Sequence, residues 1–296
     1  MLYVDIEKKL SSFTLCIRFT AEGATAMIGP SGCGKSVTLK CIAGVMKPDR
    51  GRIEYNGQVL FDSERHINLP PQKRRIGYLF QNYALFPDMT VRENTILNDT
   101  AELLHISHVL ESKPYQLSGG EAQRTALARM IVNDPDLMLF DEPFSALDMF
   151  LRDELRAQFS SLMNLLGKDR IIITHSIDEA YSLSRRMLIM DKGRIIDGGD
   201  TASIFLHPAS EKSARIMGFR NIASAYPADN GEISIPGWNI QIQRKGENTS
   251  AVCLMERDIM MAEGNGLQAS VLESLSMPDF DLLRILIKGG AEPLWM

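Results

Sequence analysis

The stretch that decides the fold is "GPSGCGKS", residues 29 to 36. Its spacing is that of a phosphate-binding loop, in which a glycine opens the turn and a Gly-Lys-Ser triplet closes it. An apolar run, "ATAMI" at 24 to 28, precedes the loop, and a helical pattern follows it. Glycines let backbone N–H groups turn inward around phosphate oxygens at a helix N-terminus, which favours anions. An ordinary glycine-rich turn is the alternative, but it does not require a strand before it and a helix after it.

The loop predicts a set of nucleotide contacts. Lys35 would reach the β- and γ-phosphates, and the Ser36 hydroxyl would bind Mg²⁺. The whole predicted nucleotide-binding segment is Gly29, Pro30, Ser31, Gly32, Cys33, Gly34, Lys35, Ser36 and Val37.

Three further apolar runs end at polar residues. In order, they are "IGYLF" (76–80) before Gln81, "DLMLF" (136–140) before Asp141 and Glu142, and "RIIIT" (170–174) before His175. Short apolar runs alternate with helical patterns over about the first 200 residues, which predicts an α/β fold with a mostly parallel sheet. Ligands of such sheets collect at the carboxyl ends of the strands, so the polar residues are expected to converge on one rim.

Each of these polar residues has a predicted role. We expect Asp141 to bind Mg²⁺ through water and Glu142 to polarise the water that attacks the γ-phosphate. Gln81 would bridge the metal and this water, and His175 would contact the γ-phosphate from the far side. The alternatives are structural: a solvated strand-end pair for the two carboxylates, a turn amide for Gln81 and a satisfied structural histidine for His175.

A second glycine pair lies in "QLSGGEAQR", residues 116 to 124. Ser118 and Glu121 form a capping box, which predicts the start of a helix. Gly119 and Gly120 are poor helix formers, yet a helix tip with bare backbone binds phosphate well. Because the first loop already supplies one phosphate cradle, we expect these three residues, Ser118 to Gly120, to cap a nucleotide held by a second copy of the chain. Two copies arranged head to tail about a two-fold axis would enclose two nucleotides.

Composition bounds the remaining choices. The chain has 296 residues, is 45% hydrophobic and carries a net charge of −5, which gives no reason to expect nucleic acid as a partner. Its four cysteines lack metal-ligand spacing and are too sparse for a disulfide scaffold, so a reducing, cytoplasmic setting is expected. The N-terminus carries charges where a signal peptide would be apolar. With no apolar stretch near the about 20 residues needed to span a bilayer, a membrane role requires a partner.

Taken together, "GPSGCGKS", Gln81, "LSGGE", "LMLFDEP", "SALD" and His175 resemble the ATP-binding cassette (ABC) ATPases over about residues 1 to 215. The resemblance implies a P-loop NTPase fold with a helical subdomain at about 82–135, ATP and Mg²⁺ as cofactors, and a head-to-tail homodimer. It also implies that Asp148 lies near the dimer interface. The family usually stacks adenine on an aromatic residue before the phosphate loop, and neither Phe13 nor Tyr3 clearly occupies that place.

The segment "QNYALFPDMTVREN" (81–94) joins Gln81 to the apolar residues Tyr83, Leu85, Phe86 and Pro87. It is either a surface packed under its own helices or a docking groove. The resemblance implies the groove, which in importers grips a helix of the transmembrane permease at the cytoplasmic face of the membrane. "VLFDSERHINLPPQKRRIGYLFQNYALFP" is most similar to molybdate importers, with sulfate importers next. An extracytoplasmic oxyanion-binding protein is the implied indirect partner.

The tail changes character after about residue 220, so we expect domains at 1–220 and 221–296. "EISIPGWNIQIQ" alternates apolar and polar residues, and later short runs are separated by turns at 229–231, 264–266 and 288–290. This pattern predicts a small all-β, barrel-like module. It resembles the regulatory module of these importers, but the chain ends at "PLWM". The module is therefore expected either to be incomplete or to be completed by the second copy.

Two other classes compete with the importer ATPase. A non-transport ABC ATPase of DNA repair or of ribosomes would have a long coiled coil or two cassettes, and this chain has one cassette and no sustained heptads. A P-loop kinase would leave "LSGGE" without a use. The sequence therefore favours an ATP hydrolase coupled to transport.

Overall fold

The computed structural model describes residues 1–95, 98–145, 149–228, 232–243, 251–254, 259, 267–276 and 281–296. The chain forms two compact units, Met1–Leu206 and His207–Met296. The division lies before helix α8, earlier than the boundary near 220 that composition indicates. Asp148 and the predicted turns at 229–231 and 264–266 lie outside the described residues.

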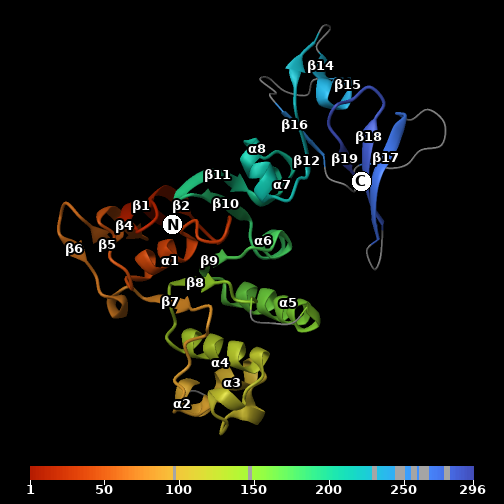
Figure 1. Ribbon diagram of the computed structural model, residues 1–296. Coiled ribbons are helices and arrows are strands. Elements are labelled where there is room, and N and C mark those ends of the chain that lie inside the picture. The colour runs from red at the N-terminus through yellow and green to blue at the C-terminus, as the bar shows by residue number, and fades with distance from the viewer. Residues whose placement is uncertain are drawn as a thin grey trace. The chain divides into compact units, whose positions relative to one another are not determined.

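The first unit is built on a six-stranded sheet with the strand order β11-β10-β3-β9-β8-β7 (Figure 1). Its strands are β3 (Ala24–Ile28), β7 (Ile76–Leu79), β8 (Leu137–Asp141), β9 (Asp169–Ile173), β10 (Arg186–Asp191) and β11 (Arg194–Asp200). All neighbours pair in parallel except β10 and β11, which form an antiparallel hairpin. The predicted α/β class with a mostly parallel sheet is confirmed. The four apolar runs expected as strands are β3, β7, β8 and β9.

These strands are apolar on both faces because helices cover both faces. Leu137, Leu139, Ile171 and Ile173 point to the side of helix α1 (Lys35–Ala43), within one hydrophobic cluster. Met138, Phe140 and Ile172 point to the other side, where helices α4 (Gly119–Val132) and α5 (Met149–Leu166) supply the cluster. Because β3, β7, β8 and β9 run parallel, their polar endings lie at the same rim of the sheet.

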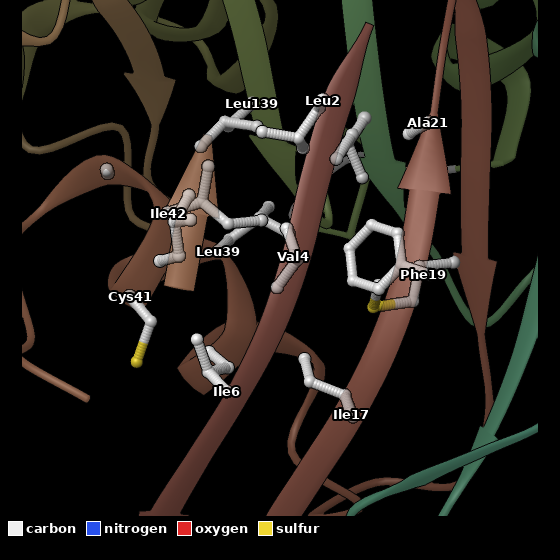
Figure 2. Packing of buried hydrophobic residues seen from close by; sticks show 14 of the residues in the cluster. Leu2, Val4, Ile6, Ile17, Phe19, Ala21, Leu39, Cys41, Ile42 and Leu139 are labelled. Carbon is white, nitrogen blue, oxygen red and sulfur yellow. The ribbon is translucent and has the colours of Figure 1, made fainter. Parts of the chain in front are cut away.

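A second sheet has the strand order β2-β1-β4-β5-β6, with antiparallel neighbours. Its strands are β1 (Leu2–Lys9), β2 (Thr14–Ala21), β4 (Arg50–Tyr55), β5 (Gln58–Asp62) and β6 (Ile67–Asn68). Leu2, Val4 and Ile6 of β1 and every second residue of β2 are buried, as expected for strands with one solvated face. Figure 2 shows these side chains in one cluster with Leu39 and Ile42 of α1, namely Leu2, Val4, Ile6, Ile17, Phe19 and Ala21. This sheet therefore supports the helix that follows the phosphate loop.

The segment between β7 and β8 is helical, as predicted. It contains α2 (Val91–Thr95), α3 (Asn98–Leu103) and α4, and α4 packs on both shorter helices and on β7 (Figure 1). Two further helices of this unit are α6 (Ile177–Leu183), which packs on β3, and α7 (Thr201–Leu206), which packs on β11. Among the described residues, no helix is long and apolar enough to cross a membrane.

The second unit begins with helix α8 (Glu211–Ile216) and continues as short strands. The strands form three small antiparallel sheets, with the orders β12-β16, β13-β14-β15 and β17-β18-β19. Their bounds are β12 (Asn221–Ser224), β13 (Tyr226–Pro227), β14 (Glu232–Ile235), β15 (Ile240–Gln243), β16 (Ala251–Leu254), β17 (Ala269–Ser276), β18 (Asp281–Ile287) and β19 (Leu294–Trp295). The predicted all-β character is confirmed, and Trp238 is buried at the centre of an apolar cluster.

Candidate active site

The phosphate loop connects β3 to α1, and its glycines are required by close packing. A Cβ at Gly29 would lie 2.0 Å from the Met190 carbonyl oxygen. Gly34 caps the helix with φ = 110°, where a Cβ would lie 2.9 Å from the Leu15 side chain. Helix α1 has no side-chain cap and no acidic residue in its first turn. Its N-terminal N–H groups and its dipole therefore favour an anion at this end.

Lys35 lies inside the loop. Its Nζ donates hydrogen bonds to the carbonyl oxygens of Gly29, at 2.7 Å, and Pro30, at 3.0 Å, and the residue is 6% exposed. The neighbouring thiol of Cys33 is also buried, and burial raises the pKa of this thiol, so it stays protonated. The ammonium group is thus a positive charge held within the loop that would surround the phosphates.

Asp141 is the last residue of β8 and is 4% exposed. Its Oδ1 accepts a hydrogen bond from the Ser36 hydroxyl at 2.8 Å, and its Oδ2 accepts one from the Tyr78 hydroxyl at 2.9 Å. Burial raises the pKa of the Tyr78 phenol far above its ordinary value, and the charge of Asp141 adds to the shift. A hydroxyl and a carboxylate in contact are oxygen ligands of the kind that Mg²⁺ prefers, together with nucleotide phosphates and water. The residues present therefore fit a magnesium ion.

Glu142 follows directly and turns out of the strand. Its backbone has φ = 50°, a left-handed conformation that a non-glycine residue adopts at some cost. Its N–H donates to the carbonyl oxygen of Ile173 at 3.0 Å, and Ser145 donates to its carbonyl oxygen. These bonds hold the backbone in this conformation and direct the side chain to the rim of the sheet.

The Glu142 carboxylate meets two other predicted residues. Gln81 Nε2 donates to Glu142 Oε2 at 3.1 Å, and His175 Nδ1 lies 3.9 Å from the same oxygen. Gln81 follows β7 and His175 follows β9, so three strand ends converge as expected. An amide, a carboxylate and an imidazole in this arrangement can orient a water molecule and accept its proton.

Ser118 caps helix α4, and the predicted capping box is confirmed. The Glu121 N–H donates to Ser118 Oγ, and the Ser118 N–H and hydroxyl donate to Glu121 Oε2. These bonds all stay within the first turn of the helix, and Gly119 is exposed. Among the described residues, no side-chain hydrogen bond of Ser118 reaches the phosphate loop of its own chain.

A groove of about 670 Å³ runs over the edge strand β7 and along α4. Tyr78, Phe80 and Phe86 line it, together with the α4 residues Ala126, Arg129 and Met130. Phe86 is 53% exposed, and the Arg129 guanidinium lies 5.1 Å from the centre of its ring. Tyr83, by contrast, is buried among the residues that pack on α4. The predicted apolar surface is thus divided: Tyr83 belongs to the core and Phe86 to the groove.

The two aromatic residues considered for adenine lie in different places. Tyr3 is on β1, and its hydroxyl donates to Asp5 Oδ2 at 3.3 Å. Phe13 precedes β2, and its ring lies 3.4 Å from the position of a Cβ on Gly34. Only Phe13, of these two, is beside the phosphate loop.

Sequence reasoning did not identify Tyr78. The run "IGYLF" indicates a buried strand, and Tyr78 is its only polar side chain. A hydroxyl inside such a run requires a partner, which was the available signal. The partner, Asp141, is 63 residues away in sequence and became visible only from the pairing of β7 with β8.

Known proteins of one family resemble this chain. The family profile described as ABC transporter matches residues 14–145. The molybdate/tungstate import ATP-binding protein WtpC of Thermococcus kodakarensis is 37% identical over 80% of this chain and 74% of the relative. The chain belongs to the ABC transporter family. This ABC protein is therefore an ATP-hydrolysing subunit coupled to transport, as its sequence indicates.

Two other relatives of this ABC protein differ in the substrate they are named for. The molybdenum import ATP-binding protein ModC of Brucella abortus is 36% identical over 83% of this chain and 73% of the relative. The spermidine/putrescine import ATP-binding protein PotA of Nitratidesulfovibrio vulgaris is 39% identical over 69% of this chain and 58% of the relative.

A solved structure resembles this ABC protein. It is a dimeric, post-hydrolysis state of the ATP-binding cassette MJ0796 bound to ADP and Pi, with a TM-score of 0.59 and 25% identity. The match covers 68% of this chain and 99% of the MJ0796 chain. The fold prediction, a nucleotide-binding cassette followed by a small β module, is confirmed.

Proposed function

We propose that this ABC protein hydrolyses ATP at the rim formed by the phosphate loop and the ends of β7, β8 and β9, and so powers the import of molybdate or a related oxyanion. The contact of Glu142 with Gln81 and His175 supports the catalytic part most directly. In this arrangement Glu142 accepts the proton of the attacking water, and Gln81 orients the water and the Glu142 carboxylate. His175 contacts the γ-phosphate from the far side.

The phosphates would be held by the loop residues Gly29 to Val37, with Lys35 as the charge at the β- and γ-phosphates. Ser36, Asp141 and Gln81 would hold Mg²⁺. When bound, this ion would neutralise charge that develops on the phosphate oxygens. Asp141 lies against Ser36 already, so the carboxylate is in place for this task.

We propose further that each nucleotide lies between the phosphate loop of one copy and the Ser118-Gly119-Gly120 tip of a second copy. The exposed Ser118 and Gly119 support this, because the N-terminus of a helix favours phosphate, and Gly120 behind them is buried. The related cassette MJ0796 is described as dimeric.

The composite site is tested by mixing two inactive variants. Lys35→Ala should remove phosphate binding, and Ser118→Arg should block the tip. If the tip acts in trans, a mixture contains heterodimers with one intact site, and ATPase activity should recover to about a quarter of wild type by statistics of mixing. A mixture that stays as inactive as its components would contradict capping by a second copy.

The groove is proposed as the docking site of a short apolar helix from a transmembrane permease. Phe86 is exposed at the groove, and the loop that carries it begins at Gln81, which contacts Glu142. A partner seated on Phe86 is therefore connected to the Glu142 carboxylate through the chain from Phe86 back to Gln81. Such docking would place the protein at the cytoplasmic face of the membrane, with an extracytoplasmic binding protein delivering the oxyanion.

The substrate assignment is supported by relatives named for molybdate or tungstate import that align with 80% or more of the chain. Sulfate or thiosulfate import is the nearest alternative by sequence pattern. Polyamine import is a second alternative, because a PotA relative from Nitrosomonas europaea also aligns with 83% of the chain at 34% identity.

Uptake into vesicles decides among these substrates. The chain, assembled with a matched permease, should drive ATP-dependent uptake of molybdate and tungstate over sulfate, and spermidine should not be taken up. The Glu142→Gln variant serves as the inactive control. Uptake of spermidine or of a sugar in preference to the oxyanions would overturn the substrate proposal and leave the ATPase assignment intact.

A further inference from the structure

Tyr78 reaches the metal carboxylate from a neighbouring strand. It pairs with Leu139 in the parallel register of β7 and β8, so Asp141 lies two residues further along β8 on the same face. Two residues of strand advance by about 6.6 Å, which is close to the reach of a tyrosine side chain. The Tyr78 hydroxyl bridges this interval and donates to Asp141 Oδ2 at 2.9 Å.

The two oxygens of Asp141 are held from different elements. Ser36, on α1, donates to Oδ1, and Tyr78, on β7, donates to Oδ2. The Ser36 hydroxyl is itself a proposed ligand of Mg²⁺, so its oxygen would bind the ion while its proton holds Oδ1. The Tyr78 hydroxyl has no proposed role at the ion and contacts only the other carboxylate oxygen, Oδ2.

The Tyr78 ring is itself fixed. It packs among the apolar residues on the α1 face of the sheet, and its centre lies 4.3 Å from that of the Phe80 ring. It also lines the groove over β7 that contains Phe86.

We propose that Tyr78 is a positioning residue that holds the Asp141 carboxylate in the orientation required for Mg²⁺. The inference rests on the proposed magnesium site at Ser36 and Asp141. Groups that orient metal ligands typically contribute 10- to 100-fold to metal affinity, so removal of this hydroxyl should have an effect that is measurable without turnover.

The test compares Tyr78→Phe with wild type in the full-length chain. Binding of a fluorescent ADP analogue is measured first in EDTA and then during titration with MgCl₂. Tyr78→Phe should leave the EDTA affinity unchanged within about twofold and shift the magnesium midpoint about 10-fold upward. Binding in EDTA requires folded protein with an intact phosphate loop. A shift of the magnesium midpoint without a change of the EDTA affinity therefore reports metal positioning and not a loss of folded protein.

Tyr55→Phe is the matched control. Tyr55 is also a largely buried strand tyrosine, and its hydroxyl donates to the Asp136 carbonyl oxygen at 2.8 Å, away from Asp141. It should leave the magnesium midpoint at the wild-type value. A midpoint for Tyr78→Phe within twofold of wild type, or an equal shift in Tyr55→Phe, would overturn the role of Tyr78.

Asp141→Asn distinguishes this failure from a failure of the magnesium site. If Asp141→Asn abolishes the dependence on magnesium and Tyr78→Phe does not shift it, the site stands and the role of Tyr78 is wrong. If Asp141→Asn keeps the wild-type midpoint, the magnesium site itself is wrong, and the inference falls with it.

Discussion

The two compact units of this protein bury different kinds of side chain. In the first unit, charged groups such as Lys35, Asp141 and Glu179 are almost fully buried beside the sheet. In the second unit, the central cluster is apolar, with Trp238 surrounded by isoleucine, leucine and alanine. Burying a charge costs free energy unless the charge has partners or binds a ligand. Buried charge therefore marks the unit that performs chemistry, and an apolar centre marks the unit that serves another role.

A buried polar residue of the second unit, Asn221, supports this distinction. Asn221 is 2% exposed, but both ends of its amide are paired with the backbone of Trp295. These two bonds tie β12 to β19. A buried polar residue with satisfied bonds is structural, whereas the rim of the first unit gathers groups that can act together on a water molecule and a phosphate.

The largest expected effect tests whether the first unit carries out the chemistry. Glu142→Gln removes the base but keeps the shape of the side chain, so ATP hydrolysis should fall about 10²- to 10⁴-fold. ATP binding should persist, and the thermal midpoint should stay close to wild type. Phosphate release and nucleotide binding are measured side by side, with Lys35→Ala as the variant that fails in both. Turnover in Glu142→Gln within about threefold of wild type would remove Glu142 from the mechanism.

The opposite effect, a loss of stability without a loss of activity, is expected in the second unit. Trp238→Ala empties the apolar centre, where Trp238 is 1% exposed, and should lower the stability of this unit by about 3–5 kcal/mol. The ATPase rate of the isolated chain should change little, since the proposed catalytic residues Gln81, Glu142 and His175 all belong to the first unit. Differential scanning calorimetry and phosphate release give the two readouts.

Ile242→Ala is the control for the Trp238 variant, because Ile242 lies in the same unit but is 39% exposed. It should cost no more than roughly 0.5 kcal/mol, as surface substitutions usually do. A fall in ATPase rate that parallels the loss of stability in Trp238→Ala would show that the two units do not divide these tasks.

The smallest expected effect concerns Ser118, which serves both stability and binding in our proposal. Ser118→Ala removes the cap of α4 and should cost about 1 kcal/mol. The hydrogen bonds from the Ser118 hydroxyl and N–H also hold the pKa of Glu121 below its ordinary value of 4.5. A depressed carboxyl pKa stabilises the folded state above the unfolded value, and this contribution is lost as pH falls through the folded value.

Urea unfolding at neutral pH and below pH 4.5 measures the Ser118 effect. Wild type should lose more stability on acidification than Ser118→Ala, because the variant no longer has the hydroxyl bond that depresses the pKa. Equal acid sensitivity of the two proteins would show that the capping box does not contribute to stability through Glu121.

Much of the candidate site could be predicted because its residues follow local rules. A glycine-rich turn between a strand and a helix, and polar residues at the ends of apolar runs, are patterns of neighbouring residues. Ser118 as a helix cap is local as well. Tyr78 could not be assigned a role in this way, because its position within an apolar run gives only its burial and not the identity of its partner.

The surface after Gln81 shows the same limit. The stretch "YALFP" (83–87) is apolar throughout, and no periodicity distinguishes Tyr83, which is 7% exposed, from Phe86, which is 53% exposed. This difference in exposure arises from the positive φ angles at Tyr83 and Ala84, which turn the chain before it reaches Phe86. Such angles are uncommon for non-glycine residues and are imposed by the surrounding structure.

By itself, the sequence determined the α/β class, the phosphate loop, the ends of the strands and the cap of α4, because each depends on residues within a few positions of one another. Only the tertiary structure decided which side chains share a hydrogen bond across strands, as Tyr78, Ser36 and Asp141 do, and which aromatic residue is left in the groove. Those outcomes depend on strand order and register, which bring together residues that are far apart in the chain and are selected by packing of the whole sheet.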